Sequence, residues 1–166
     1  SDWSFDNYKP LPFWKQSAVM EDGARGYPFF AITFKEALHT FADTVVMPWL
    51  TEVSEKDPVH GGILINSQTA AKFNIQTGTR IRLTSPAGSI EGVAQVVEGI
   101  HPQVLGVSNA ITRDFVTNPG VRVKGSHFNR LLTGSLRYTD SATGGLESTA
   151  RVRLEVTPKW GEKVRY

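Results

Sequence analysis

The sequence predicts a mainly β protein, a small barrel of about six short strands with few helices. Short segments rich in β-branched and aromatic residues recur between turns made of Gly, Pro and Asn. Few stretches show a helical spacing of apolar residues, and those stretches are short. A length of 166 residues, 40% of them hydrophobic and 20% charged, suits one globular domain with its own core.

The chain divides into an arm, a barrel and a tail. Residues 1–26 predict an irregular, aromatic and proline-rich arm, because two prolines forbid a regular helix there. Residues 21–26 (EDGARG) predict a flexible joint at the end of the arm. The barrel is expected over residues 27–157, and the basic segment 158–166 predicts a frayed tail.

The barrel opens with a strand and a possible helix. The nearly continuous apolar run 27–34 (YPFFAITF) predicts a strand buried on both faces. In residues 36–47 the apolar side chains recur at three- and four-residue spacings, which predicts a helix stopped by Pro48. Residues 52–62 predict a loop.

The central block alternates strands with one short helix. Residues 63–66 (ILIN) predict a strand, and Ser67 predicts the N-cap of the helix that follows. Gly78 predicts a turn with a positive φ. Residues 79–98 predict a β-hairpin around a Pro-Ala-Gly-Ser turn, with alternating apolar residues facing inward.

The last third contains two further strands and a long connection. Residues 103–108 (QVLGVS) predict one strand. Residues 109–140 are polar and rich in turn residues, which is typical of a loop that covers a functional site. Alternation over 149–157 predicts the closing strand, with Leu154 and Val156 facing inward.

Composition excludes several kinds of chemistry. The absence of cysteine excludes disulfides, thiolate zinc sites, cysteine-ligated iron–sulfur clusters and a cysteine nucleophile. His39, His60, His101 and His127 lack the spacing of common metal motifs, so we expect no metal site. No GxSxG, GxGxxG or Walker A motif is present, and no catalytic residue is predicted. No apolar run approaches the ~18 residues of a membrane span, so we expect no direct membrane insertion.

The charge is distributed unevenly along the chain. Residues 1–60 carry five basic and nine acidic residues, whereas residues 61–166 carry thirteen basic and seven acidic residues. The second part is therefore basic although the net charge is only +2. A basic surface is typical of an anionic partner, and a solvated surface of mixed charge is the alternative interpretation.

One long motif is more specific than these patterns. The segment ILINSQTAAKFNIQTGTRIRLTSPAGSIEGVAQVVEGIHPQVLGVS runs through strand, short helix with an Ala pair, Ile-x-x-Gly turn, hairpin, Ile-x-Pro and strand. With it the chain resembles the C-terminal molybdopterin-dinucleotide-binding domain of the dimethyl sulfoxide reductase family of molybdenum oxidoreductases. Further matching parts are YPFFAITFKEALHT before it, and HFNRLLT, DSATG and the closing strand after it. The resemblance covers residues 27–157 and implies a six-stranded double-psi β-barrel.

The resemblance also implies residues that bind the cofactor, molybdopterin guanine dinucleotide. They lie in the loops that leave the strands: Thr33, Phe34, Lys35, His39, Thr40, Ser108, Asn109, His127, Asn129, Arg130 and Asp140. Lys35 and Arg130 would face phosphate, while Asn129 and Asp140 would pair with ring edges. The family often has arginine where this chain has Lys35, so the phosphate contact would be monodentate. The segment 129–133 is stretched relative to the family, and residues 111–125 have no clear match.

The resemblance implies that the chain is part of a larger molybdenum or tungsten oxidoreductase. The metal ligand and the iron–sulfur cysteines would come from other domains of that catalytic subunit, and an iron–sulfur electron-transfer subunit would be a partner. The isolated chain is then expected to carry no cofactor and to be inactive. The arm and the segment around His39 are most similar to the catalytic subunits of phenylacetyl-CoA:acceptor, polysulfide and thiosulfate oxidoreductases. A bacterial or archaeal source is implied, with cytoplasm and periplasm both open.

The alternative from another class is a stand-alone small barrel that binds nucleic acid or a protein partner. The basic second part supports it, as do aromatic residues such as Phe115 and Phe128 that could stack on bases. The cofactor-binding interpretation predicts no nucleic-acid partner.

Overall fold

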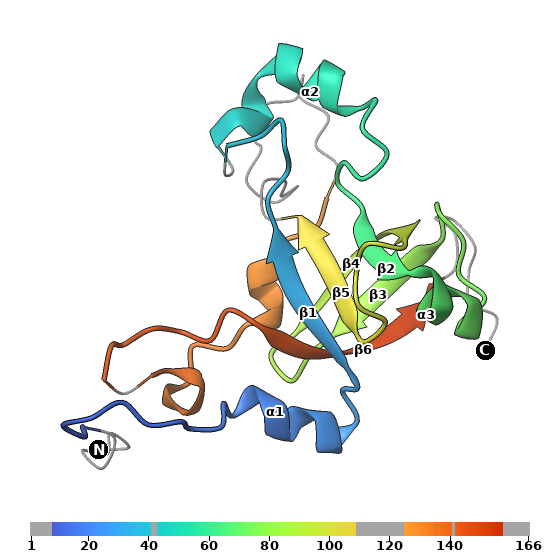
Figure 1. Cartoon of the computed structure of the whole chain (residues 1–166). Helices are drawn as coiled ribbons and strands as arrows, with labels where there is room; N and C mark the ends of the chain where they lie inside the picture. The colour runs from blue at the N-terminus through green and yellow to red at the C-terminus, as the bar shows by residue number, and fades with distance from the viewer. Residues whose placement is uncertain (1–7, 41–42, 109–124, 141, 158–166) are drawn as a thin grey trace.

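The computed structural model describes residues 8–40, 43–108, 125–140 and 142–157. Within them six strands form a closed barrel in the order β1-β5-β2-β4-β3-β6, which confirms the mainly β fold predicted from the sequence (Figure 1). The strands are β1 (Phe29–Phe34), β2 (Ile63–Asn66), β3 (Arg80–Thr84), β4 (Ser89–Val97), β5 (Val104–Ser108) and β6 (Ala150–Val156). The predicted tail, 158–166, lies outside the described residues.

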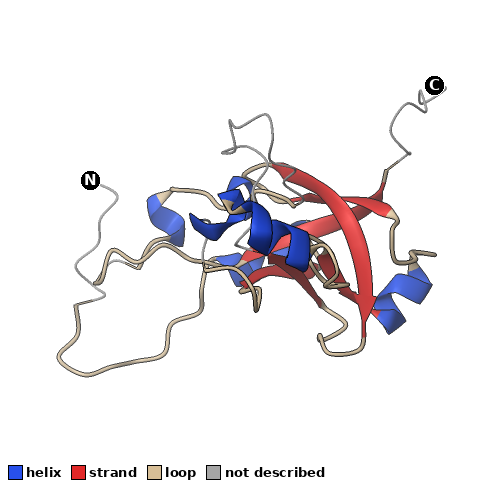
Figure 2. Ribbon diagram, turned by 90° about the horizontal axis from the view of Figure 1, so that it is seen from above, coloured by secondary structure: helices blue, strands red, loops and turns tan. Residues whose placement is uncertain are grey.

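Two of the six strand pairings are parallel. β1 runs parallel to β5, and β2 runs parallel to β4, while the other four pairings are antiparallel. Closure leaves no strand with an unpaired edge, so the backbone groups of the sheet are satisfied without a partner chain. Figure 2 shows the strands enclosing the core, with the short helices outside it.

The core consists of β-branched and aliphatic side chains that point into the barrel. Ile65, Ile81, Leu83, Leu105 and Val152 are each 0% exposed. Burial of side chains of this size stabilises the fold by about 1.5–3 kcal/mol each. The predicted hairpin is confirmed as β3 and β4, joined by a turn in which Ser85 accepts from the backbone of Ala87 and Gly88.

In the described part of the chain, three short α-helices and several 3₁₀ turns lie around the barrel (Figure 2). The α-helices are α1 (Val19–Asp22), α2 (Pro48–Ser54) and α3 (Ser67–Lys72). The 3₁₀ turns are η2 (Gly23–Arg25), η3 (Asp43–Val46), η4 (Phe128–Leu131) and η5 (Leu136–Tyr138). None of the helices in the described residues has the length and apolar character needed to cross a bilayer.

The helix predicted over 36–47 is wrong. The described residues of that region, 36–40 and 43–47, contain only the 3₁₀ turn η3, and α2 begins at Pro48. Proline is favoured at the first position of a helix, because that position needs no N–H donor and the ring fixes a helical φ. The residue interpreted as a stop signal is therefore a start signal.

Three smaller expectations also differ from the structure. β1 is not buried on both faces, because its outer side is only partly covered: Arg151 lies over Phe30, while Ile32 is 37% exposed. Asn66 rather than Ser67 caps α3, accepting from the backbone N–H of Gln68. Val156 lies near the end of β6 and is 51% exposed rather than inward.

Residues 21–26 form the end of α1 and the 3₁₀ turn η2, not a joint. Asp22 is 2% exposed, and both of its carboxylate oxygens accept from the Tyr138 hydroxyl, at 2.9 and 3.1 Å. Arg151 of β6 donates to the carbonyl of Tyr27, and its guanidinium lies 4.1 Å from the centre of the Phe30 ring. The segment that precedes β1 is thus anchored to the barrel.

We predict that Asp22→Ala destabilises the chain by about 1–3 kcal/mol, because it leaves the half-buried hydroxyl of Tyr138 without its acceptor. Glu21→Ala is the matched control, since Glu21 is the adjacent acid and forms an exposed ion pair with Arg137. Its loss should cost less than about 1 kcal/mol. Urea unfolding measures both, and equal stability of the two variants would contradict an anchoring role for Asp22.

Candidate functional site

The candidate site lies at the end of the barrel where β1 and β5 finish. Their parallel register places Phe34 beside Ser108, and the antiparallel register of β2 places Ile63 beside Val107. The segments 33–40, 60–62 and Ser108 therefore meet, and we call them the carboxyl rim. Loops held at one end of a rigid barrel are a common place for binding residues.

The carboxyl rim brings together most of the first predicted group. Thr33, Phe34, Lys35, His39 and Thr40 follow or end β1, and Ser108 ends β5. Thr33, Lys35 and Thr40 are exposed, whereas His39 and Ser108 are buried, at 6% and 2%. The predicted residue Asn109 lies outside the described residues. Between Lys35 and Gly62 the chain makes a long excursion that contains α2 (Figure 1).

Glu36 anchors the start and the end of this excursion to each other. Its side chain is 3% exposed, and Oε2 lies 2.7 Å from Nδ1 of His60. Oε1 accepts from the backbone N–H of Gly61 at 2.9 Å. A buried carboxylate is costly unless it is paired, and these two donors supply the pairing.

His39 is held inside the excursion by hydrogen bonds at both ring nitrogens. Ser54 Oγ donates to the carbonyl of Leu50, so it accepts from Nε2–H of His39 at 2.7 Å. Thr44 Oγ1, which accepts from the backbone N–H of Thr40, lies 3.1 Å from Nδ1 of His39. The Ser54 contact places a proton on Nε2, and in the neutral ring Nδ1 is then the acceptor for the Thr44 hydroxyl.

Electrostatics support the neutral form of His39. Burial lowers the pKa of His39 below its ordinary value of 6.5, and the negative charge of Glu36 offsets part of that shift. The ring of His60 stacks on that of His39, with 5.5 Å between ring centres and 25° between planes. Two stacked imidazoles disfavour a second positive charge.

Glu36 and His60 were not among the predicted site residues. Glu36, His39 and His60 each place a potential ligand atom within 4.8 Å of the others. No local spacing motif marks this group, because 20 residues lie between the two histidines and only the folded excursion brings them together. The one local feature that points to this group is the pair of opposite charges directly after β1, where Lys35 is exposed and Glu36 is buried.

The second predicted group lies on the segment that enters 3₁₀ turn η4. Ser126 donates to the carbonyl of Glu91, and Gly92 makes room for it, since a Cβ there would lie 2.7 Å from Ser126 Oγ. His127 is half-buried, and Asn129 and Arg130 are exposed on η4. Phe128 between them is 4% exposed and belongs to the core.

Asp140 lies away from the carboxyl rim and caps its own turn. Its Oδ1 accepts from the backbone N–H groups of Ala142 and Thr143 and from the Thr143 hydroxyl. The backbone hydrogen bond from Thr143 is the main cause that lowers the pKa of Asp140. Its segment is tied through Tyr138 to Asp22, which precedes β1, so Asp140 and Lys35 lie toward opposite ends of that strand (Figure 1).

Comparison with known proteins identifies related sequences and folds. The family described as "Molydopterin dinucleotide binding domain" matches residues 35–153. No curated protein sequence matches the chain. Among solved structures, acetylene hydratase from Pelobacter acetylenicus is similar, with a TM-score of 0.68 and 13% identity over 89% of this chain. The chain spans only 21% of the length of that enzyme, and the likeness at this identity concerns the fold alone.

We predict that His39 titrates below pH 6.5 and remains in the Nε2–H form, which nitrogen-detected NMR of the imidazole rings measures. Since its folded-state pKa is lowered, the stability contributed by neutral His39 is complete above pH 6.5 and declines as the pH falls through the lowered pKa. The unfolding free energy of His39→Gln should therefore vary less with acidification than that of the wild type. A midpoint at or above 6.5 would refute the assignment.

Proposed function

Since the chain belongs to the molydopterin dinucleotide binding domain family, we propose that it binds molybdopterin guanine dinucleotide as the C-terminal domain of a larger molybdenum or tungsten oxidoreductase. The proposal rests on the range of residues that matches the family. It begins at Lys35, the first residue after β1, and it takes in the whole carboxyl rim from that point on.

The chemistry of the site fits a dinucleotide. A pyrophosphate needs cationic groups and N–H donors, and ring edges need paired donors and acceptors. Lys35 on the carboxyl rim and Arg130 on η4 supply cations, and the exposed amide of Asn129 supplies both a donor and an acceptor. His60 adds an imidazole held by the buried Glu36.

The chain's part in the enzyme is to bind and orient the cofactor. When bound, the cofactor supplies the redox-active metal, and we assign the metal ligand and the electron carriers to other domains. The described residues and the cysteine-free sequence offer no thiolate for either task. The proposed role of Asp140 at a ring edge is the one that its local hydrogen bonds support least.

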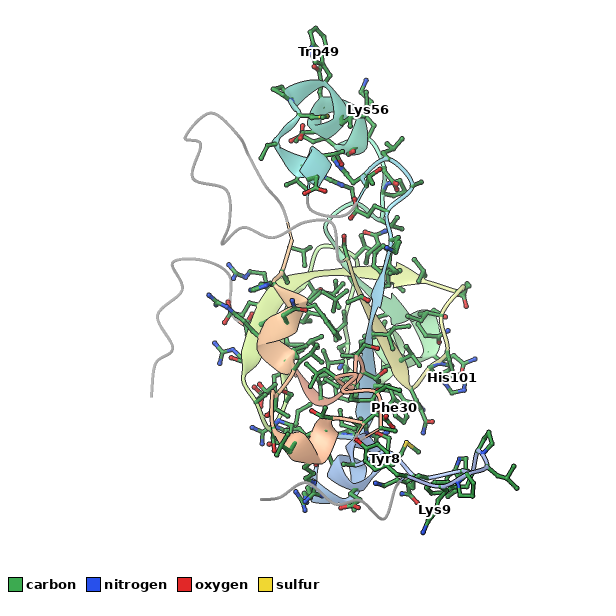
Figure 3. The ribbon with its side chains drawn as sticks, turned by 90° about the vertical axis from the view of Figure 1, so that its left-hand side faces the viewer. Tyr8, Lys9, Phe30, Trp49, Lys56 and His101 are labelled. Atoms are coloured by element: carbon green, nitrogen blue, oxygen red, sulfur yellow. The ribbon has the colours of Figure 1, made fainter. Side chains whose placement is uncertain are left out.

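The remaining domains of the enzyme would cover two exposed surfaces. One is the tip of the excursion, where Trp49 is 82% exposed and points away from the barrel, with Met47 and Val53 also exposed (Figure 3). The other is the arm at the opposite end, where Trp14 is 82% exposed. Apolar surface of this kind marks contacts with other protein. An iron–sulfur subunit as a further partner follows only from the resemblance to the enzyme family.

The structure gives less support to a nucleic-acid-binding module. Phe128 is buried and cannot stack on bases, and Phe115 lies outside the described residues. Arg80 and Arg82 of the basic second part are paired with Glu91 across the hairpin. Part of the positive charge seen in the sequence is therefore neutralised within the barrel surface.

We predict that Asn129→Ala lowers cofactor occupancy of the full-length enzyme, because each polar group left unsatisfied on the ring edge costs about 1–3 kcal/mol. Lys35→Ala should also lower occupancy, with an effect that shrinks as salt rises, because a phosphate contact at an exposed lysine is mostly Coulombic. The measurement is guanine nucleotide released per polypeptide after acid hydrolysis. Lys72→Ala is the control, since Lys72 ends α3 beyond β2, away from the carboxyl rim. Full occupancy in both test variants would argue against the proposed site.

We also predict a difference in hydrogen exchange between the isolated chain and the full enzyme. In the isolated chain, residues 8–16 and the tip of the excursion should exchange rapidly, while β3 and β4 are protected by the barrel. In the full enzyme, both rapid segments should become protected. Protection of residues 8–16 in the isolated monomer would indicate a self-sufficient protein instead.

A further inference from the structure

Nε2 of His60 is the ring nitrogen that points away from Glu36, and we call it the outer nitrogen of His60. The His60 side chain is 5% exposed, and Nδ1 is engaged by Glu36. No described residue hydrogen-bonds to Nε2. In the described part of the chain, Thr157 Oγ1 is the only fully buried side-chain polar atom that lacks a partner. Nε2 of His60 therefore reaches the surface of an otherwise buried ring.

A metal ion is not the occupant that these contacts favour. Both nitrogens of His39 are used, since Nε2–H donates to Ser54 and Nδ1 accepts from Thr44. A cation would have to break one of these bonds to gain a third ligand. The 2.7 Å between His60 Nδ1 and Glu36 Oε2 is a hydrogen-bond distance, shorter than the separation of two ligands on one zinc ion.

The surroundings favour an anion at Nε2. With Nδ1–H donating to Glu36, protonation at Nε2 turns the ring into a donor at both ends. The buried carboxylate stabilises the resulting imidazolium, and the neutral, stacked His39 adds no repulsion. Lys35 precedes Glu36 in the chain and places a second cation on the same rim.

We propose that His60 is a phosphate-binding residue, whose protonated ring is held by Glu36 and donates from Nε2 to a phosphate oxygen of the dinucleotide. The inference rests on the proposed function and adds a residue to its site. Binding takes up one proton from solvent at Nε2, and no covalent bond changes. Glu36 is a positioning residue, since it acts through His60.

The test uses the 166-residue chain with labelled histidine, and pyrophosphate, guanosine diphosphate and guanosine as probes. At neutral pH, pyrophosphate and guanosine diphosphate should move the His60 nitrogen signals to the imidazolium pattern, and guanosine should not. The exposed His101, which precedes β5 at its other end, should not respond (Figure 3).

Two variants separate a ligand contact from a structural role. His60→Asn keeps a donor near the Nδ1 position for Glu36 and removes the outer nitrogen, so the dissociation constant for guanosine diphosphate should rise on the order of tenfold. His60→Gln places its amide nitrogen near the Nε2 position and should restore part of that loss. His101→Asn is the matched control and should bind as the wild type does.

The outcomes distinguish the two proposals. Wild-type affinity in His60→Asn, or binding of the diphosphate without a change at the His60 ring, overturns the role of His60 and leaves the proposed function intact. A His60 response to guanosine alone overturns the phosphate assignment. Absence of binding of pyrophosphate and guanosine diphosphate to the wild-type chain overturns the role of His60, whereas the proposed function is tested separately by cofactor occupancy of the full-length enzyme.

Discussion

The parallel pairing of β1 with β5 is the constraint on which the rest of the structure depends. Two parallel strands cannot be joined by a tight turn, so the chain between them must leave the barrel and return. Here it returns through β2, β3 and β4, and β6 then closes the barrel by pairing with both β1 and β3. The same pairing ends both strands on one side, so two connections that are distant in sequence begin side by side. The strand topology therefore brings the segments of the carboxyl rim together, whichever side chains they carry.

Buried carboxylates fasten the chain at both ends of β1. Asp22 precedes the strand and accepts from Tyr138, while Glu36 follows it and pairs with His60 and Gly61. Each acid joins segments that are far apart in sequence, and each would be costly to bury without its partners. The two anchors differ in kind. The partner of Asp22 is a phenol, whereas Glu36 pairs with an imidazole and a backbone N–H. The outer nitrogen of that imidazole is the group that we propose binds a phosphate oxygen.

The strands could be predicted from the sequence because each carries its own local pattern. Ile81 and Leu83 alternate with two arginines, and this pattern specifies the inner face of the hairpin. Ile81 and Leu83 are each 0% exposed. Predictions failed where a local signal has two meanings. Proline both stops and starts helices, and Pro48 starts one. An apolar run such as 27–34 fits a doubly buried strand, yet the outer face of β1 is only partly covered and leaves Ile32 37% exposed.

The site was harder to predict because its members are paired by tertiary structure. His39 and His60 show no metal spacing and belong to one stacked group only after the excursion folds. Hydrogen-bond directions then decide what that group can do. Ser54 donates to the carbonyl of Leu50, and this places a proton of His39 on Nε2, while burial lowers the pKa of the ring and favours its neutral form. Both ring nitrogens of His39 are thus occupied inside the excursion. His60 keeps Nε2 for the phosphate contact that we propose.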